Sequence, residues 1–135
     1  MSVVVDASVA LKWVIEEPGS EAAIELRDEE LIAPGLWLAE AANALWRHVR
    51  LNELTAEDAL TRLDQLSNAP VTPFAAERLI ADALRLAVKI PHSVYDCIYL
   101  AVAIRHDSYV VTDDRRFFSA ASAPTLAGRV RLLGA

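Results

Sequence analysis

The sequence feature that most constrains this fold is a short β-branched run that ends in a carboxylate and passes directly into a helical pattern. Val3–Val5 are followed at once by Asp6, and from Ala7 the apolar residues suit a helix. A run this short suits a buried strand better than a core helix. Similar short apolar runs recur at 31–33 and 109–111. Strands that alternate with helices in this way predict an α/β fold, a three-layer α/β/α sandwich with a central parallel sheet.

Periodicity and helix-breaking residues divide the rest of the chain. The expected strands are 2–6, 31–33, 109–111 and 130–133, and the connection at 68–73 can hold a short strand at Val71. The expected helices are 7–16, 20–28, 36–50, 55–66, 74–88 and 93–105, with a short helix or turn from Arg115. Because no internal repeat, low-complexity segment or linker interrupts this pattern, we expect a single domain over 1–135.

Composition narrows the class of protein. Hydrophobic residues make up 54% of the chain and charged residues 24%, as in a folded, soluble protein. No apolar run approaches the roughly 20 residues that span a bilayer, and the N-terminus lacks the basic leader of a signal sequence. The single cysteine, Cys97, excludes an intrachain disulfide and fits a reducing compartment. We therefore expect a cytoplasmic protein with no membrane partner, and a small core residue at Cys97.

Four acidic residues, the acid quartet, occupy positions where a carboxylate needs a partner. Asp6 and Asp114 each follow a short apolar strand, and Glu40 and Asp96 each lie on a helix among apolar neighbours. Two carboxylates about 5 Å apart repel by roughly 3 kcal/mol at an effective dielectric near 20. A hard cation such as Mg²⁺ or Mn²⁺ removes that cost, and a water that it binds can attack a phosphodiester. If the four acids converge, they favour phosphate chemistry.

Each acid also has a purely structural interpretation. Asp6 and Asp114 can each cap the helix that follows. Glu40 can be a solvated acid on a striped helix face. Asp96 can belong to a capping box that starts at Ser93, a spacing that recurs elsewhere in the chain and is unspecific. The joint placement of the four acids carries the functional interpretation, since none of them is specific alone.

Four sequence blocks together resemble the motifs of PIN-domain ribonucleases. They are VVVDASVALKW, APGLWLAEAANAL, SVYDCIYLAVA and YVVTDDRRF, and they run in the family's order over essentially the whole chain. The resemblance is closest to the VapC-type toxins of bacterial and archaeal toxin–antitoxin pairs. It implies a small PIN-like α/β/α domain, a Mg²⁺- or Mn²⁺-dependent endoribonuclease, a homodimer, and a VapB-like antitoxin that blocks the site.

The resemblance also implies a role for each acid. Asp6, Asp96 and Asp114 match the family's aspartates and would hold one or two cations. Glu40 matches the helix glutamate and would complete the cluster or orient the attacking water. Asp113 occupies the variable position beside Asp114, so we expect it to be auxiliary or exposed.

Polar neighbours of the acids complete the expected site. The resemblance extends to Ser8, Asn43 and Thr112, and it implies that these residues would hold carboxylates and waters in place. Net charge is −6, which argues against binding nucleic acid through bulk positive charge but leaves room for a local basic rim. Five cations near the acids are candidates for contacts to RNA phosphates, with ordinary surface charge as the alternative for each. They are Lys12, Arg47, Arg50, Arg115 and Arg116.

Other conspicuous side chains are expected to be structural. The tryptophans Trp13, Trp37 and Trp46 occupy core-like helix positions. The histidines show no metal-ligand spacing, and we expect none to be catalytic. They are His48, His92 and His106. The helix pair around 36–66 offers apolar surface for a partner helix, with the domain's own core as the alternative.

Three other classes of protein are less consistent with the sequence. A haloacid dehalogenase-type phosphotransferase needs a second aspartate two residues after the first, where this chain has Ser8. A receiver domain keeps its acceptor aspartate near mid-chain, whereas the strand-end acids here lie near the two ends. A non-catalytic PIN-like module that binds RNA or a partner is the remaining alternative. Such a module is expected to lose one or more acids, and this chain has all four.

Overall fold

The computed structural model describes residues 2–135 and contains a five-stranded sheet in the order β3-β2-β1-β4-β5. All four strand pairs are parallel. The central strand carries the opening valine run, and its three valines are at most 2% exposed because helices cover both faces. The strands are β1 (Ser2–Val5), β2 (Glu30–Pro34), β3 (Val71–Phe74), β4 (Val110–Thr112) and β5 (Val130–Leu132).

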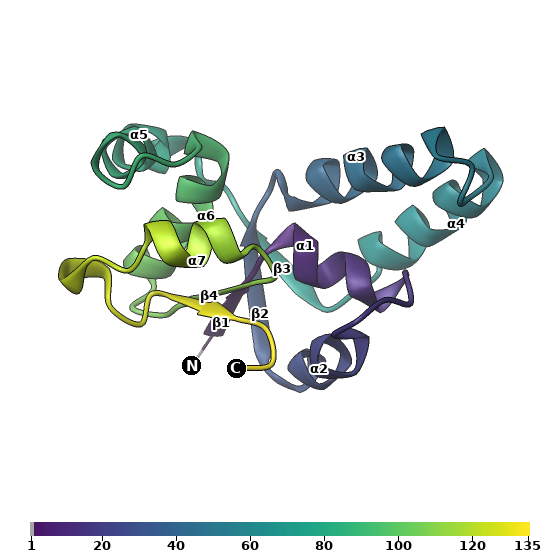
Figure 1. Cartoon of the computed structure of the whole chain (residues 1–135), viewed down its shortest axis with the longest axis horizontal. Helices are drawn as coiled ribbons and strands as arrows, with labels where there is room; N and C mark the ends of the chain where they lie inside the picture. The colour runs from purple at the N-terminus through teal and green to yellow at the C-terminus, as the bar shows by residue number, and fades with distance from the viewer. Residues whose placement is uncertain (1) are drawn as a thin grey trace.

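Helices form a layer on each side of the sheet (Figure 1). The first layer holds α1 (Ala7–Ala10), α2 (Ser20–Glu25), α3 (Trp37–Arg50) and α4 (Ala56–Ser67). The second layer holds α5 (Ile80–Lys89), α6 (Val94–Arg105) and α7 (Arg115–Ala120). The chain steps outward from β1 to β3 and then reverses to β4 and β5, so right-handed crossovers place the later helices on the opposite face. This arrangement confirms the predicted α/β/α sandwich.

Short 3₁₀ segments extend three of these helices: η1 (Leu11–Trp13) follows α1, η2 (Leu26–Asp28) follows α2, and η3 (Glu77–Leu79) precedes α5. A fourth, η4 (Pro124–Leu126), lies between α7 and β5.

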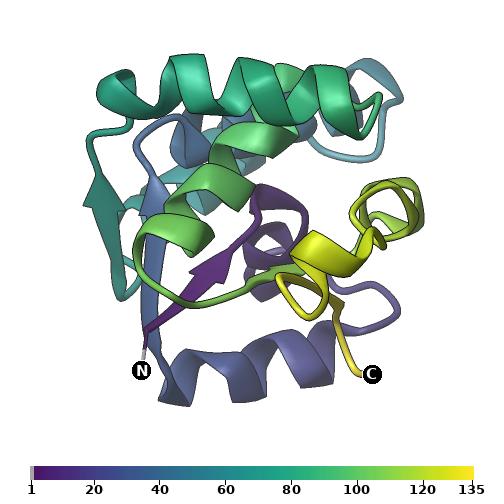
Figure 2. The same cartoon turned by 90° about the vertical axis from the view of Figure 1, so that its left-hand side faces the viewer.

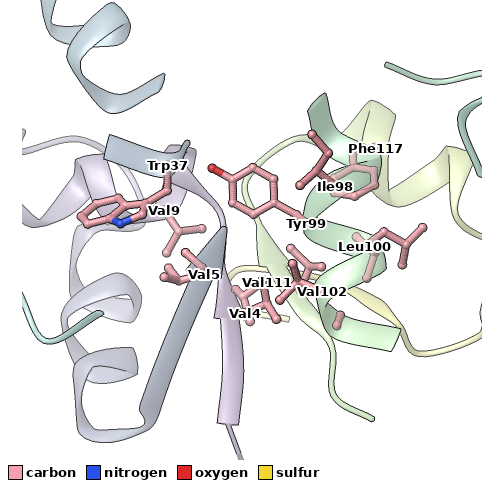
Figure 3. Packing of buried hydrophobic residues seen from close by; sticks show 14 of the residues in the cluster. Val4, Val5, Val9, Trp37, Ile98, Tyr99, Leu100, Val102, Val111 and Phe117 are labelled. Atoms are coloured by element: carbon pink, nitrogen blue, oxygen red, sulfur yellow. The ribbon is translucent and has the colours of Figure 1, made fainter. Parts of the chain in front are cut away.

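Helix α6 is the most buried helix, and it carries Asp96, one of the acid quartet. It contacts β1, β2 and β4, and Figure 2 shows it as the green helix that crosses in front of the sheet. Figure 3 shows Tyr99 and Val102 on one side of the strands, with Val9 and Trp37 on the other. The hydroxyl of Tyr99 points past the strand ends toward α3, whereas its ring is fully buried. The first turn of α6 therefore lies near the carboxyl ends of the central strands.

Two element boundaries differ from the prediction by three residues, and most of the others lie within one residue of it. The expected helix 74–88 begins later, because Phe74 belongs to β3 and the helical region starts at Glu77. An edge strand tolerates Pro73, since its missing N–H is not needed by a neighbouring strand. The expected helix 7–16 ends at Trp13. There Ser20 accepts the N–H of Glu17 and donates to the carbonyl of Ile15, and these bonds hold a turn in place of further helix.

The predictions for isolated core residues were mostly confirmed. Cys97 and Trp37 are buried, at 0% and 5% exposure. Trp13 is half-buried, and its indole N–H donates to the carbonyl of Ala23 at 2.7 Å. The prediction for Trp46 was wrong, because this side chain is 51% exposed on α3.

The length and hydropathy of the helices bear on whether any of them could cross a membrane. Within residues 2–135, no single helix is long and apolar enough to cross a bilayer. Only the strongly bent pair Glu77–Lys89 and Val94–Arg105 reaches that length and composition jointly.

Candidate active site

Asp6 lies where β1 passes into α1, and two hydroxyls hold its carboxylate. Ser8 Oγ donates to Asp6 Oδ2 at 3.0 Å, and Thr112 Oγ1 donates to the same oxygen at 2.6 Å. Asp6 occupies the N-cap position of α1, but its side chain makes no capping hydrogen bond. Helix capping therefore does not explain this buried carboxylate, which is 6% exposed.

The same hydroxyls connect Asp6 to the end of β4. Ser8 Oγ accepts the N–H of Asp113 at 3.2 Å, and Thr112 Oγ1 accepts the N–H of Asp114 at 3.1 Å. Each hydroxyl thus donates to the carboxylate and accepts from the turn after β4. Ser8 and Thr112 therefore both contact Asp6, and together their hydrogen bonds fix the orientation of its carboxylate.

Glu40 reaches the site from α3 and is held by a residue that the sequence analysis missed. The Tyr99 hydroxyl donates to Glu40 Oε1 at 2.6 Å. Burial raises the pKa of Tyr99, and the negative charges of Asp6 and Glu40 raise it further, so the phenol stays a neutral donor. Tyr99 follows Asp96 by three residues and shares its helix face, which is the signal that could have identified it.

Asp96 and Asp114 meet across the N-termini of α6 and α7. Ser93 caps α6 by accepting the N–H of Asp96 at 3.3 Å, while the Asp96 carboxylate lies 2.6 Å from His92 Nε2. Asp114 does cap α7, because its Oδ1 accepts from the N–H groups of Arg116 and Phe117 at 2.9 and 3.3 Å. The capping interpretations of Asp96 and Asp114 are therefore partly correct, and neither excludes a role in the cavity.

One compact group of possible metal ligands includes a histidine. Single ligand atoms of His92, Asp96 and Asp114 all lie within 4.8 Å of one another. The expectation that no histidine has metal-ligand spacing was wrong for His92. Its offset of four from Asp96 was visible, but α6 begins only at Val94, so helical spacing did not predict the contact. Among the described residues, this compact group excludes Asp6 and Glu40.

Burial and mutual repulsion make the carboxylates of Asp6 and Glu40 suited to lie beside a bound cation. Burial raises the pKa of Asp6, the Thr112 and Ser8 hydroxyls oppose that rise, and the charge of Asp96 adds to it. Burial also raises the pKa of Glu40, with the Tyr99 hydrogen bond opposing and the charges of Asp6 and Asp96 adding. A divalent cation bound nearby would reverse both effects, since opposite charge favours the ionised carboxylate.

The acid quartet lines one cavity of about 590 Å³ at the carboxyl ends of the strands. Asn43 and Arg47 lie on α3, about one and two turns after Glu40, and they line the same cavity. Ser8 and Asp113 contribute to its wall. The structure therefore gathers residues from four separate sequence blocks around one space. Ligands bind at this edge of a parallel sheet in α/β folds.

Comparison with known proteins identifies the family. Residues 3–123 match the PIN domain. The chain belongs to the PIN-domain family. This PIN domain is 32% identical over 120 residues to Ribonuclease VapC3 of Pyrobaculum aerophilum, across 86% of this chain and 92% of that protein. The resemblance to PIN-domain ribonucleases of the VapC type is thus confirmed.

Solved structures support the fold. PAE2754 from Pyrobaculum aerophilum superimposes with a TM-score of 0.76 at 23% identity, over 98% of this chain and 90% of that chain. Mycobacterium tuberculosis VapC20, described as a Sarcin-Ricin loop cleaving toxin, superimposes with a TM-score of 0.67 at 16% identity, over 87% of this chain and 94% of that chain. FitAcB from Neisseria gonorrhoeae superimposes with a TM-score of 0.62 at 16% identity, over 97% of this chain and 96% of that chain.

Lys12 lies in a different environment from the basic rim that we expected. It is 4% exposed, and its Nζ lies 3.0 Å from Glu17 Oε1 and 3.1 Å from Asp113 Oδ2. The Nζ also donates to the carbonyl of Pro18 at 2.8 Å. Burial opposes the charge, but the hydrogen bonds and charges of Glu17 and Asp113 outweigh it and raise the pKa of Lys12. All three donors of the ammonium are used inside this PIN domain, so Lys12 is a poor candidate for binding phosphate.

The arginines of the expected rim occupy exposed positions. Arg47 is exposed and lines the cavity, and Arg115 and Arg116 are exposed on α7 directly after Asp114. Arg50 lies further along α3, where its guanidinium carbon is 5.0 Å from the ring centroid of Trp46. The three arginines nearest the acids remain available for an anionic ligand.

Proposed function

We propose that this PIN domain is a divalent-metal-dependent endoribonuclease. The observation that carries the proposal is the convergence of the acid quartet on one cavity, with the pKa values of Asp6 and Glu40 raised by burial and by neighbouring carboxylates. Buried acids with raised pKa values in a cleft are typical of functional sites. The relative at 32% identity is named a ribonuclease, which makes RNA the preferred substrate class.

The donor set suits Mg²⁺ or Mn²⁺, with Asp96 and Asp114 as ligands and Asp6 joining them directly or through water. A bound cation would neutralise charge on the phosphate and make water a better nucleophile. Glu40 would orient the attacking water or accept its proton, since a raised pKa brings a carboxylate closer to that of an effective general base.

Neighbouring groups would keep the acids in these roles. Ser8 and Thr112 hold Asp6, Tyr99 holds Glu40, and Asn43 is placed to contact water or a phosphate oxygen. Asp113 is committed to the ion pair with Lys12 and would act only indirectly.

RNA would approach along the exposed arginines. Arg47, Arg115 and Arg116 would bind phosphates that flank the scissile bond. Charge reversal at Arg115 and Arg116 together should weaken RNA binding and flatten its salt dependence. Unchanged affinity and an unchanged salt slope would reject this contact surface.

Metal-dependent cleavage by purified protein tests the proposal. We expect a quenched RNA substrate to be cut with Mg²⁺ or Mn²⁺, and EDTA to abolish the reaction. Asp6→Asn should be inactive while it keeps the wild-type circular dichroism spectrum, and the exposed control Asp28→Asn should retain activity. RNA binding without cleavage under all metal conditions would favour the alternative, a non-catalytic binding module. Full activity of Asp6→Asn would reject the assigned site.

We further propose that this nuclease is the toxin of a toxin–antitoxin pair. An apolar groove of about 330 Å³ runs between α3 and α4, with Trp46 and Leu60 exposed by 51% and 67%. This groove is suited to the apolar face of a VapB-like antitoxin helix. Co-expression with the product of a short adjacent reading frame should relieve growth arrest, and Trp46→Glu should prevent that relief. Continued relief with Trp46→Glu would exclude this groove.

We also propose a homodimer formed through α5 and α6. Ile80, Leu84, Val88 and Ile104 are exposed apolar side chains on this helix pair, with Val88 76% exposed. Ile80, Leu84 and Val88 recur every four residues and therefore lie along one face of α5. Exposed apolar surface of this kind is typical of protein interfaces. Light scattering should give a dimer for the wild type and a monomer for Val88→Glu, and a monomeric wild type would exclude the proposal.

A further inference from the structure

His92 takes no part in the function proposed above, yet its ring is tightly held beside the acids. Its backbone N–H donates to the carbonyl of Ala87 at 3.1 Å. Its ring stacks on Phe117, with centroids 5.2 Å apart and an interplanar angle of 12°. Nε2 lies 2.6 Å from Asp96 Oδ2, and the side chain is 16% exposed. These three contacts leave the imidazole one well-defined position.

The elements that hold His92 also hold the two nearest carboxylates. Phe117, which supports the ring, is fully buried and donates its backbone N–H to Asp114 Oδ1. Ser93, the next residue after His92, caps α6 through the N–H of Asp96. One unit made of two helix N-termini therefore positions all three side chains. Such support is typical of metal sites, where neighbouring groups orient the ligands.

The spacing of the three ligand atoms suits one cation. Ligands about 2.1 Å from an octahedral ion lie about 3.0 Å apart when adjacent and about 4.2 Å apart when opposite. The observed separations are 2.6 Å between His92 Nε2 and Asp96 Oδ2, which are hydrogen-bonded, and no more than 4.8 Å within the group. These separations bracket the octahedral values, so a bound ion would replace the hydrogen bond and separate these two atoms by about 0.4 Å. Two carboxylates and one neutral imidazole also carry a charge of −2, which a divalent ion balances.

We propose that His92 is a nitrogen ligand of a divalent cation that Asp96 and Asp114 bind through oxygen. Such a mixed site would favour Mn²⁺ over Mg²⁺, because Mg²⁺ takes oxygen ligands and transition metals accept imidazole more readily. The inference rests on the proposed metal dependence and adds a ligand that the acid quartet does not include.

Pulsed EPR of Mn²⁺-loaded, tag-free protein tests the ligand directly. We expect nitrogen coupling from a directly bound imidazole in the wild type, and loss of that coupling in His92→Gln. The matched control is His48→Gln, because His48 lies on α3 and pairs with Glu53 at 3.6 Å. By calorimetry, His92→Gln should weaken Mn²⁺ binding at least about tenfold, with a smaller change for Mg²⁺.

The possible outcomes separate this inference from the proposed nuclease. If Mn²⁺ binds the wild type without nitrogen coupling, His92 is not a ligand and only orients Asp96, whereas metal-dependent cleavage can persist. If neither Mn²⁺ nor Mg²⁺ binds, both proposals fail. The chain has three histidines, so a His48→Gln/His106→Gln double variant leaves only His92. Nitrogen coupling that survives in this variant supports the proposal even if His92→Gln does not fold, and its absence overturns the proposal.

Discussion

The N-termini of α4 and α6 carry the same capping sequence but lie in very different surroundings. Thr55 Oγ1 accepts the N–H of Asp58 at 3.0 Å, and Ser93 Oγ accepts the N–H of Asp96 at 3.3 Å. The carboxylate of Asp58 is exposed to solvent, whereas that of Asp96 is 22% exposed and lies against His92. The capping motif starts a helix in both places, and it becomes part of a candidate active site in only one.

The difference comes from where each helix sits relative to the sheet. Helix α4 belongs to the outer part of its layer and packs on α3, while α6 packs on β1, β2 and β4. The first turn of α6 therefore meets the carboxyl ends of the central strands, where Asp6 and Asp114 emerge. Tertiary position, and not the local motif, gives Asp96 other carboxylates as neighbours.

The largest contrast is expected between the two capping-box acids. If the proposed nuclease is correct, Asp96→Asn should reduce RNA cleavage about 10²–10⁴-fold, because it removes one of the proposed cation ligands from the cavity. Asp58→Asn should leave cleavage within about twofold of wild type, since that solvated carboxylate does not line the cavity. Initial rates at fixed RNA and Mn²⁺ measure both, with circular dichroism as the folding control. Equal losses in the two variants would remove the functional distinction between the helices.

A second contrast tests the residue one turn beyond each acid. Tyr99→Phe should lower cleavage about 10–100-fold, because it removes the donor that orients Glu40 while keeping the ring. The matched change on α4 is Thr61→Val, since the Thr61 hydroxyl bonds only the carbonyl of Glu57 in its own helix. Thr61→Val should not alter the cleavage rate. Wild-type activity in Tyr99→Phe would show that Glu40 needs no support from α6.

A third contrast concerns the effect of charge on stability. The pKa of folded Asp6 is raised above its ordinary value of 3.8, so the folded state binds its proton more tightly than the unfolded state. Stability should therefore fall as pH rises through the folded-state pKa of this group. In metal-free protein at pH 7, Asp6→Asn should raise Tm by about 2–5 °C. The gain should shrink as the pH approaches 4.

The control for the effect of the Asp6 charge on stability is again Asp58 of α4. Asp58→Asn should lower Tm slightly, because an acid in the first turn of a helix is favourable by about 0.3–1 kcal/mol. Thermal scans in EDTA from pH 4 to 8 measure both variants. A lower Tm for Asp6→Asn at pH 7 would contradict the expectation that burial of the Asp6 charge, together with the nearby charge of Asp96, destabilises the metal-free protein.

The smallest contrast is expected at the caps themselves. Thr55→Ala and Ser93→Ala should each lower the free energy of unfolding by about 0.5–2 kcal/mol, because each removes one side-chain acceptor from a helix N-terminus. Urea unfolding at pH 7 measures both. Similar losses would confirm that the motif has the same local role in α4 and α6, and a much larger loss for Ser93→Ala would show that its cap also supports the cavity.

Much of the fold was predictable because it depends on short-range patterns. The valine run before Asp6, the apolar run before Thr112 and the pattern of helix breaks indicated strands, helices and their order. Since parallel strands end at one edge of a sheet, the meeting of Asp6 with the end of β4 was also predictable. Boundaries such as the start of the helix after Phe74 were not, because an edge strand accommodates a proline that helical periodicity does not register.

The sequence by itself determined which side chains share one element, and the tertiary structure decided which elements face each other. It identified the acid quartet and the hydroxyls of Ser8 and Thr112. The burial of Lys12 against Asp113, the exposure of Trp46 and the contact of His92 with Asp96 depend on packing between elements or on irregular backbone. The periodicity of a helix or strand predicts which of its side chains point in the same direction. The packing of the layers decides which residue of another element each of those side chains contacts.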